Sequence, residues 1–363
     1  MSSVQPVDNQ APADALWQSW QTLKSALPNL RTRNAAETLG VPEAALVAAS
    51  VGKQAVRLSD DFPDILKSLE PLGSVMALTR NGSAVHERHG VYRNGGFRRH
   101  GEMHIGLFVN PDIDLRLFMH HWKFGFAVTE GAGDKLRHSL QFFDQEGTAV
   151  HKVYLTEASD EAAYRRLVET FTHPEQTRSL EFEAYAEPAV PPADEDVDWP
   201  AFESEWRALQ DTHDFFPLLN RYKVDRQQAF AQVGDDLAYR VSNNAAREVL
   251  EQAAATQCPI MVFVGNRGCI QIHSGPVKRL ATLGPWFNVL DPEFNLHLHE
   301  EHIVHTWVTR KPTADGIVTA LELFDARGEL IATLFGQRKP GIPELEAWRH
   351  IVHAVPALEC GHA

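Results

Sequence analysis

Residues 138–155, HSLQFFDQEGTAVHKVYL, return 181 residues later as TALELFDARGELIATLFG at residues 319–336. Both stretches carry Phe-Asp-x-x-Gly in the middle, and alternating apolar residues flank it on each side. Alternation broken by a turn signal is typical of a β-hairpin that buries one face. The chain is therefore predicted to build the same antiparallel hairpin twice.

The repeat extends beyond this hairpin. Residues 110–117 lie over residues 291–298 at the same offset, with Asn-Pro-Asp matching Asp-Pro-Glu. Residues 74–85 lie over residues 259–270 at a slightly different offset, as expected where a loop has changed length. A register kept over roughly fifty residues indicates an internal duplication.

Each half shows the same order of patterns. Helical periodicity comes first, then short alternating strands separated by Asn-Gly, Asn-Arg-Gly and Asp-x-x-Gly turns, and then a helix such as residues 160–171. This order predicts an α+β fold, with each half a large antiparallel sheet and helices at its ends. Residues 187–198, EPAVPPADEDVD, are acidic and rich in proline, so we expect a linker between repeats 1–186 and 199–363.

The composition excludes several classes of protein. The 363 residues are 44% hydrophobic and carry a formal net charge of −14, which argues against a nucleic-acid partner. We find no run of eighteen apolar residues and no basic-then-apolar leader in MSSVQPVDNQAPADALW, so neither membrane insertion nor secretion is expected. Three scattered cysteines suit neither a disulfide framework nor a zinc site. These features favour a cytoplasmic location.

Polar residues that differ between the halves point to a site in one half. In the second half, Trp206, Leu209, His213 and Phe216 are three and four residues apart, which predicts a shared helical face with the imidazole among apolar side chains. The matching stretch of the first half has the apolar Leu27 near that place. From the helix alone, a core or helix-end histidine is the favoured interpretation, and an axial ligand for haem iron is the alternative.

Arg116 is the second difference. Period-two alternation places Ile113, Leu115 and Leu117 on one face of a strand and Arg116 on the other, together with Asp114. The sister strand has a histidine at the matching position. Taken alone, an exposed arginine paired with a neighbouring aspartate is the favoured interpretation.

Two further arginines belong to the second half. Arg338 stands where the first half has Glu157, and Arg226 lies thirteen residues beyond His213. Guanidinium groups bind carboxylates through two parallel hydrogen bonds, so this pair could hold the two propionates of a haem.

A histidine cluster needs separate consideration. Residues 295–305, NLHLHEEHIVH, could supply metal ligands, but a metal site needs three or four ligands that converge. A polar strand end leading into a solvated helix is the favoured interpretation. We find no Gly-x-Ser-x-Gly, no Cys-x-x-Cys-His and no phosphate loop, and Gly-Asn-Arg-Gly at residues 265–268 is interpreted as a hairpin turn.

These segments resemble the bacterial hemin-degrading factor family, the cytoplasmic haem-trafficking and haem-degrading proteins of Gram-negative haem-uptake systems. The resemblance runs from about Trp17 to Trp348. Its motifs here are NPDIDLRLF, SLQFFDQEG, W-x-x-L-x-D-T-HDFF, RQQAF, MVFVGNRGC, VTRKPTADG, LELFDARGE and LFGQR.

The resemblance implies a site for non-covalently bound haem b. His213 stands where the family's iron ligand stands, and Arg116 stands where an arginine covers the opposite face, directly or through a water. Arg226 and Arg338 match arginines that approach the porphyrin edge or the propionates. Phe335 replaces a tyrosine found in some members, which makes the edge of the pocket more apolar.

The resemblance leaves two roles open. A carrier would receive imported haem from an importer and pass it to a haem oxygenase. An enzyme would open the porphyrin ring with dioxygen and an external reductant, since the sequence has no flavin or nicotinamide fingerprint. A third alternative is a duplicated module for another apolar ligand, or for a metal held by the histidines of residues 297–305.

Overall fold

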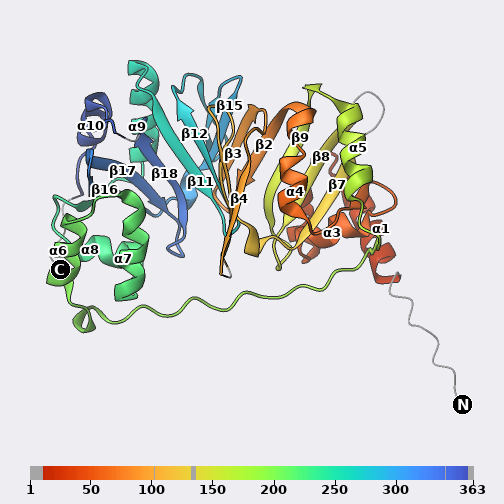
Figure 1. The fold of residues 1–363 in the computed structure, drawn as a ribbon, viewed down its shortest axis with the longest axis horizontal. Helices are drawn as coiled ribbons and strands as arrows, with labels where there is room; N and C mark the ends of the chain where they lie inside the picture. Colours follow the sequence, from red (N-terminus) through yellow and green to blue (C-terminus); the bar gives the residue numbers. More distant parts are fainter. Residues whose placement is uncertain (1–10, 102, 132–135, 340, 359–363) are drawn as a thin grey trace, which may run out of the picture. The chain divides into compact units, whose positions relative to one another are not determined.

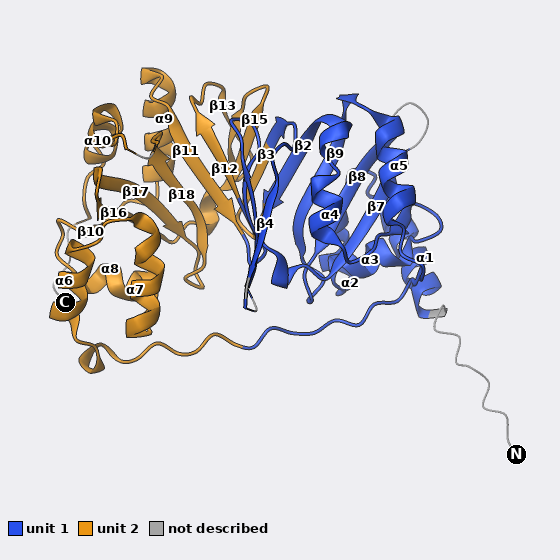
Figure 2. Ribbon diagram, viewed as in Figure 1, with its two compact units in different colours: residues 1–79, 88–186, 266–270 blue, residues 80–87, 187–265, 271–363 orange. Residues whose placement is uncertain are grey.

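The computed structural model describes residues 11–101, 103–131, 136–339 and 341–358 (Figure 1). Residues 1–10 of the stretch examined for a leader therefore lie outside the described residues, and so does Cys360. The chain divides into two compact units (Figure 2). Unit 1 comprises residues 1–79, 88–186 and 266–270, and unit 2 comprises residues 80–87, 187–265 and 271–363.

Unit 1 begins with helices, continues through antiparallel strands and ends on a helix. Its elements are α1 (Ala11–Ala26), α2 (Thr32–Leu39), α3 (Glu43–Ala49), β1 (Ala55–Arg57), α4 (Phe62–Lys67), β2 (Gly73–Arg80), β4 (Gly96–His100), β5 (Met103–Val109), β6 (Asp114–Phe118), β7 (Phe124–Glu130), β8 (Arg137–Phe143), β9 (Ala149–Ser159) and α5 (Glu161–Phe171). The strand order is β1-β7-β8-β9-β2, with β6-β5-β4 as a further set.

Unit 2 has the same plan. Its elements are α6 (Trp199–Arg207), α7 (Phe215–Tyr222), α8 (Arg226–Gln232), β10 (Ala238–Val241), α9 (Ala245–Thr256), β11 (Ile260–Gly265), β13 (Leu280–Leu283), β14 (Trp286–Leu290), β15 (Phe294–His299), β16 (His305–Thr313), β17 (Gly316–Phe324), β18 (Leu330–Gly336) and α10 (Glu346–His353). The strand order is β10-β16-β17-β18-β11, with β15-β14-β13 as a further set. Strands β3 (Ala84–Gly90) and β12 (Cys269–Gly275) each give residues to both units.

The strand register confirms the duplication. Ser139 pairs with Tyr154 in unit 1, and 181 residues later Ala320 pairs with Phe335 in unit 2. The register shifts between Phe142 and Phe143, and again at the matching place, between Leu323 and Phe324. The α+β fold with a tandem duplication is therefore as predicted.

The predicted Asp-x-x-Gly turns explain why these hairpins form where they do. Asp144 accepts the backbone N–H groups of Glu146 and Thr148 through Oδ1, and Asp325 repeats this bonding one repeat later. Gly147 and Gly328 both have a φ of +79°, a conformation that strains other residues. The aspartate satisfies the turn's N–H groups, and the glycine supplies the left-handed bend.

The main sheet of unit 2 has two differently covered faces. One face, with Val308, Leu321 and Leu334, is buried in one core cluster with residues of α9 and α10. Trp307 and Phe324 point to the opposite face and join the core formed with α6, α7 and α8. Because side chains alternate along a strand, this second face also carries Lys311, Glu322 and Phe335.

Candidate functional site

His213 does not lie on a helical face with Trp206 and Leu209, so that prediction is wrong. Helix α6 ends at Arg207, and His213 lies in a short 3-10 helix, η5 (Thr212–Asp214), before α7 begins. Pro217 lies in the first turn of α7 and has no N–H to continue an earlier helix. The His213 side chain is 87% exposed, and Phe216 is 62% exposed instead of packing into an apolar stripe.

Asp211 holds the His213 ring. Its Oδ1 accepts the backbone N–H of His213 at 2.9 Å and lies 2.6 Å from the ring Nδ1. The backbone hydrogen bond, the ring and the positive charge of Arg338 together lower the pKa of the Asp211 carboxyl. The carboxylate is thus ionised at neutral pH, and Nδ1 is the ring nitrogen it engages, which leaves Nε2 for a ligand. Sequence reasoning missed Asp211, although Asp-x-His was a usable signal for such a turn.

Arg338 and Phe335 come from the end of β18 in the same unit. Phe335 is half-buried, and its ring packs against Phe263 of β11 with centroids 5.0 Å apart. Register places Met261 opposite Phe335, so Met261, Phe263 and Phe335 form a half-buried apolar strip on the face covered elsewhere by α6 to α8. Arg338 follows two residues after β18 and acts on Asp211 through its charge. The structure therefore associates Arg338 with the turn that carries His213.

Arg226 belongs to a buried ionic network. It is the first residue of α8, it is 31% exposed, and its Nη1 lies 2.5 Å from Oε2 of the fully buried Glu322. Lys311 contacts Oε1 of the same carboxylate at 2.6 Å, and Thr309 donates to it at 2.7 Å. Burial raises the pKa of Glu322, but Lys311 and Arg226 outweigh burial and bring that pKa to about 2. Sequence reasoning found Arg226 and missed this carboxylate.

The network also connects the sheet to the start of α7. The Lys311 Nζ lies over the ring of Phe215 at 4.7 Å, and the Arg226 guanidinium lies 5.8 Å from the same ring. Phe215 is buried and follows His213 by two residues. Lys311 and Arg226 thus contact the buried residue at the start of α7, two residues after His213.

Arg116 belongs to unit 1, where β6 has the predicted alternation. Ile113, Leu115 and Leu117 are buried, and Arg116 is half-exposed on the other face with its Nη1 bonded to Asp114. Burial raises the pKa of Asp114, and Arg116 opposes this effect. The register places Leu107 of β5 opposite Arg116. Its face of β5 also presents the exposed Met103 and Val109, an apolar surface that sequence reasoning missed.

The histidines of residues 297–305 bond to separate partners. The Nδ1 atom of His297 lies 2.6 Å from Asn288, that of His302 lies 3.1 Å from Ser83, and that of His305 lies 2.7 Å from Gln227. Within the described residues, no three histidine, cysteine, aspartate or glutamate side chains form a group suited to a metal ion.

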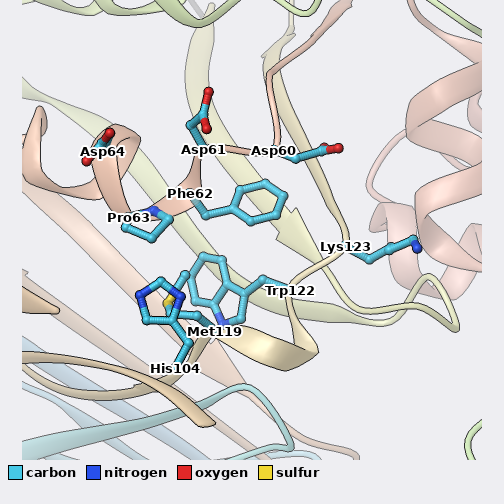
Figure 3. Close-up of a pocket in the computed structure, with 9 residues that line it drawn as sticks. All are labelled: Asp60, Asp61, Phe62, Pro63, Asp64, His104, Met119, Trp122 and Lys123. Atoms are coloured by element: carbon cyan, nitrogen blue, oxygen red, sulfur yellow. The ribbon is translucent and has the colours of Figure 1, made fainter. Parts of the chain in front are cut away.

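A pocket of about 380 Å³ lies in unit 1 (Figure 3). Its floor is aromatic, with the rings of Phe62 and Trp122 6.0 Å apart, and its rim is acidic. The lining residues are Asp60, Asp61, Phe62, Pro63, Asp64, His104, Met119, Trp122 and Lys123. Three carboxylates would repel the propionates of a haem, so this pocket does not suit that ligand.

Two other predictions concern thiols and membranes. Cys258 and Cys269 are buried free thiols. Among the helices that the structure describes, none is long and apolar enough to cross a membrane.

Comparison with known proteins gives one consistent result. The family described as "Haemin-degrading HemS.ChuX domain" matches residues 40–171 and again residues 223–355. A hemin transport protein, HmuS of Yersinia pestis, is 45% identical over 337 residues, which cover 92% of this chain and 95% of that protein. Both matched segments of the family fall on the repeats found in the sequence.

Two solved structures are similar over almost the whole chain. The haem-binding protein PhuS of Pseudomonas aeruginosa, in its holo form, has 47% sequence identity and a TM-score of 0.93, with 95% of this chain and 99% of that chain covered. ChuS, described as an E. coli haem oxygenase, has 42% identity and a TM-score of 0.84, with 94% and 99% covered.

Proposed function

Because this chain belongs to the HemS/ChuX family of haemin-degrading proteins, we propose that it is a cytoplasmic carrier that binds haem b non-covalently through His213. In this proposal it receives haem from an importer and passes it to a haem oxygenase. One observation carries the ligand assignment: His213 is exposed, and the carboxylate of Asp211 engages its Nδ1. A neutral imidazole with a free Nε2 is the common protein ligand of haem iron.

The surroundings of His213 suit the rest of a haem. Met261, Phe263 and Phe335 offer half-buried apolar surface to the porphyrin plate. Arg338 and the exposed part of Arg226 offer positive charge to its propionates. We also propose the repeat boundaries 1–186 and 199–363 with the linker 187–198, so that the site residues other than Arg116 come from the second repeat.

Arg116 enters the proposal as a hydrogen-bond donor on the side of the haem opposite His213. An arginine keeps its proton, so it acts through a water or hydroxide on the iron and does not replace His213 as the ligand. Its pairing with Asp114 already orients its guanidinium within unit 1.

A hemin titration tests the ligand. We expect a saturable Soret band in the wild type and a loss of at least about a hundredfold in affinity, near 3 kcal/mol, in His213→Ala. His302→Ala is the matched control, because it removes a histidine of the 297–305 cluster and should leave the band unchanged. No saturable band in the wild type, or equal loss in both variants, would overturn the assignment.

Ring opening is the second candidate function. It is favoured by the 42% identity to ChuS, which is described as a haem oxygenase, and by the donor that Arg116 offers to iron-bound oxygen. The haem complex would be treated with ascorbate in air with catalase present. A Soret band that persists after reduction supports the carrier, and decay to an open tetrapyrrole with iron release supports the enzyme.

A further inference from the structure

The Asp211–His213 contact determines which ring nitrogen of His213 carries a proton. Oδ1 of Asp211 accepts the backbone N–H of His213, and as an acceptor toward the ring as well it pairs with an Nδ1–H across the 2.6 Å contact. The same Oδ1 accepts the His213 backbone N–H at 2.9 Å, which fixes the carboxylate relative to the ring. Nε2 is then the ring nitrogen that Asp211 does not engage, on a side chain that is 87% exposed.

This arrangement belongs to unit 2. In the sequence match that places Trp20 over Trp206, Ser25 stands at the position of Asp211 and Leu27 at that of His213. The Ser25 hydroxyl donates to the carbonyl of Gln21 within α1 and serves its own helix. Unit 1 thus has neither the imidazole nor the carboxylate.

We infer that Asp211 is a positioning residue that fixes the His213 tautomer and makes the site bind ferric haem more tightly than ferrous haem. The inference rests on the proposed function, since it assumes that Nε2 of His213 binds iron. A carboxylate that accepts the Nδ1 proton makes the imidazole a stronger donor, and a stronger, partly anionic donor favours the higher charge of ferric iron.

Three variants separate the parts of this role. Asp211→Asn keeps a side-chain oxygen that can accept the backbone N–H and the ring N–H of His213, and asparagine also suits the capping position. It removes the negative charge of the carboxylate. Asp211→Ala removes the acceptor as well. Asp214→Asn is the matched control, because it removes the same charge from the other side of His213, where the aspartate makes no capping bond to α7.

The first readout needs no haem. Nitrogen chemical shifts of the His213 ring in the apo protein, measured by NMR, should show the Nδ1–H tautomer in the wild type, in Asp211→Asn and in Asp214→Asn. Asp211→Ala should lose this preference. A wild-type ring with its proton on Nε2 would overturn the inference.

The second readout uses hemin complexes. Transfer of hemin to apomyoglobin should be about tenfold or more faster in Asp211→Asn, as is typical when a group that hydrogen-bonds to a metal ligand is changed. The haem midpoint potential should rise in that variant, the iron–histidine stretching frequency of its ferrous complex should fall, and the ratio of ferric to ferrous affinity should decrease. Asp214→Asn should match the wild type in all four measurements.

The results distinguish the two proposals. If His213→Ala behaves as proposed but Asp211→Asn matches Asp214→Asn in potential and stretching frequency, the inference about Asp211 is wrong and the haem ligand stands. If the wild type forms no haem complex, the proposed function fails, while the apo tautomer still tests the orientation of the ring.

Discussion

The third helix of each unit is held to its sheet by a buried ion pair, but the two pairs have opposite polarity. In unit 1, Glu43 opens α3 and pairs with Lys152 of β9 at 2.7 Å. In unit 2, Arg226 opens α8 and pairs with Glu322 of β17. The charge at the start of the helix is negative in unit 1 and positive in unit 2, and the strand partners do not match in position, because Lys152 stands where unit 2 has Thr333.

The reversal shows what a positive group near the proposed haem site requires. A cation at the first residue of a helix is unfavourable with the helix dipole, whereas Glu43 is favourable there. Unit 2 offsets this with Glu322, which stands where unit 1 has Gln141. An arginine for the ligand therefore depends on a carboxylate deep in the core, and this dependence can be tested.

The largest expected effect comes from breaking the two pairs. Glu322→Gln leaves Lys311 buried without its carboxylate, so we expect a loss of about 3–5 kcal/mol in the free energy of unfolding, measured by urea denaturation at pH 7. Glu43→Gln is the counterpart in unit 1, with a comparable loss because Lys152 is equally buried. Only Glu322→Gln should also weaken hemin binding, since only it releases Arg226. Equal effects of the two variants on hemin affinity would contradict the comparison.

The next largest expected effect is that acid destabilises unit 1 before unit 2. Burial lowers the pKa of His151 in unit 1 to about 3, against 6.5 for an exposed ring, and the ring lies 2.6 Å from Tyr92 and 2.8 Å from Thr79. Between pH 6.5 and pH 3 the ring of His151 is protonated in the unfolded chain but not in the folded one. Its contribution to the free energy of unfolding is therefore fully present above pH 6.5 and decreases as the pH falls towards 3. The loss is about 2 kcal/mol at pH 5.

In unit 2, the contribution of Glu322 to the free energy of unfolding is retained to lower pH. Because the pKa of Glu322 is lowered to about 2, its contribution is present above pH 4.5 and is lost only below that. Hydrogen exchange at pH 7 and pH 5 should show β8 and β9 losing protection before β17 and β18. His151→Gln should reduce this difference. Earlier loss of protection in β17 and β18 would count against the account.

The smallest effect concerns the charge near the end of the last strand of each main hairpin. Arg338 in unit 2 stands where unit 1 has Glu157. Arg338→Gln should reduce hemin affinity several-fold, about 0.5–1 kcal/mol, and most at low ionic strength, because the group is partly solvated. Glu157→Gln should have no effect. Isothermal titration at two salt concentrations measures both, and a loss in Arg338→Gln that is independent of salt would exclude a charge effect.

The fold could be predicted from sequence because its signals are periodic and local. The Asp-x-x-Gly turns at Asp144 and Asp325 end the strands where expected, and the 181-residue offset relates the residue pairs of one hairpin to those of the other. Residues 206–216 were different. Their apolar spacing fits a helix, but Asp211 and Pro217 impose a turn, and local hydrogen bonding prevailed over periodicity.

The site could be predicted only in part. His213, Arg226, Arg338 and Phe335 were found because they differ between the copies or match family motifs. The Glu322 partner of Arg226 lies 96 residues away in the chain, and no sequence spacing indicates that contact. The same holds for the strip formed by Met261 and Phe335, which depends on the register of β11 and β18.

The central claim is that one copy of a duplicated fold carries the haem ligand. The most direct test is the number of hemin equivalents bound, determined by titrating wild type, His213→Ala and Leu27→Ala and following the Soret band. The account predicts one tight equivalent in the wild type and in Leu27→Ala, and none in His213→Ala. Two equivalents of similar affinity in the wild type, or a tight equivalent that survives in His213→Ala, would contradict it.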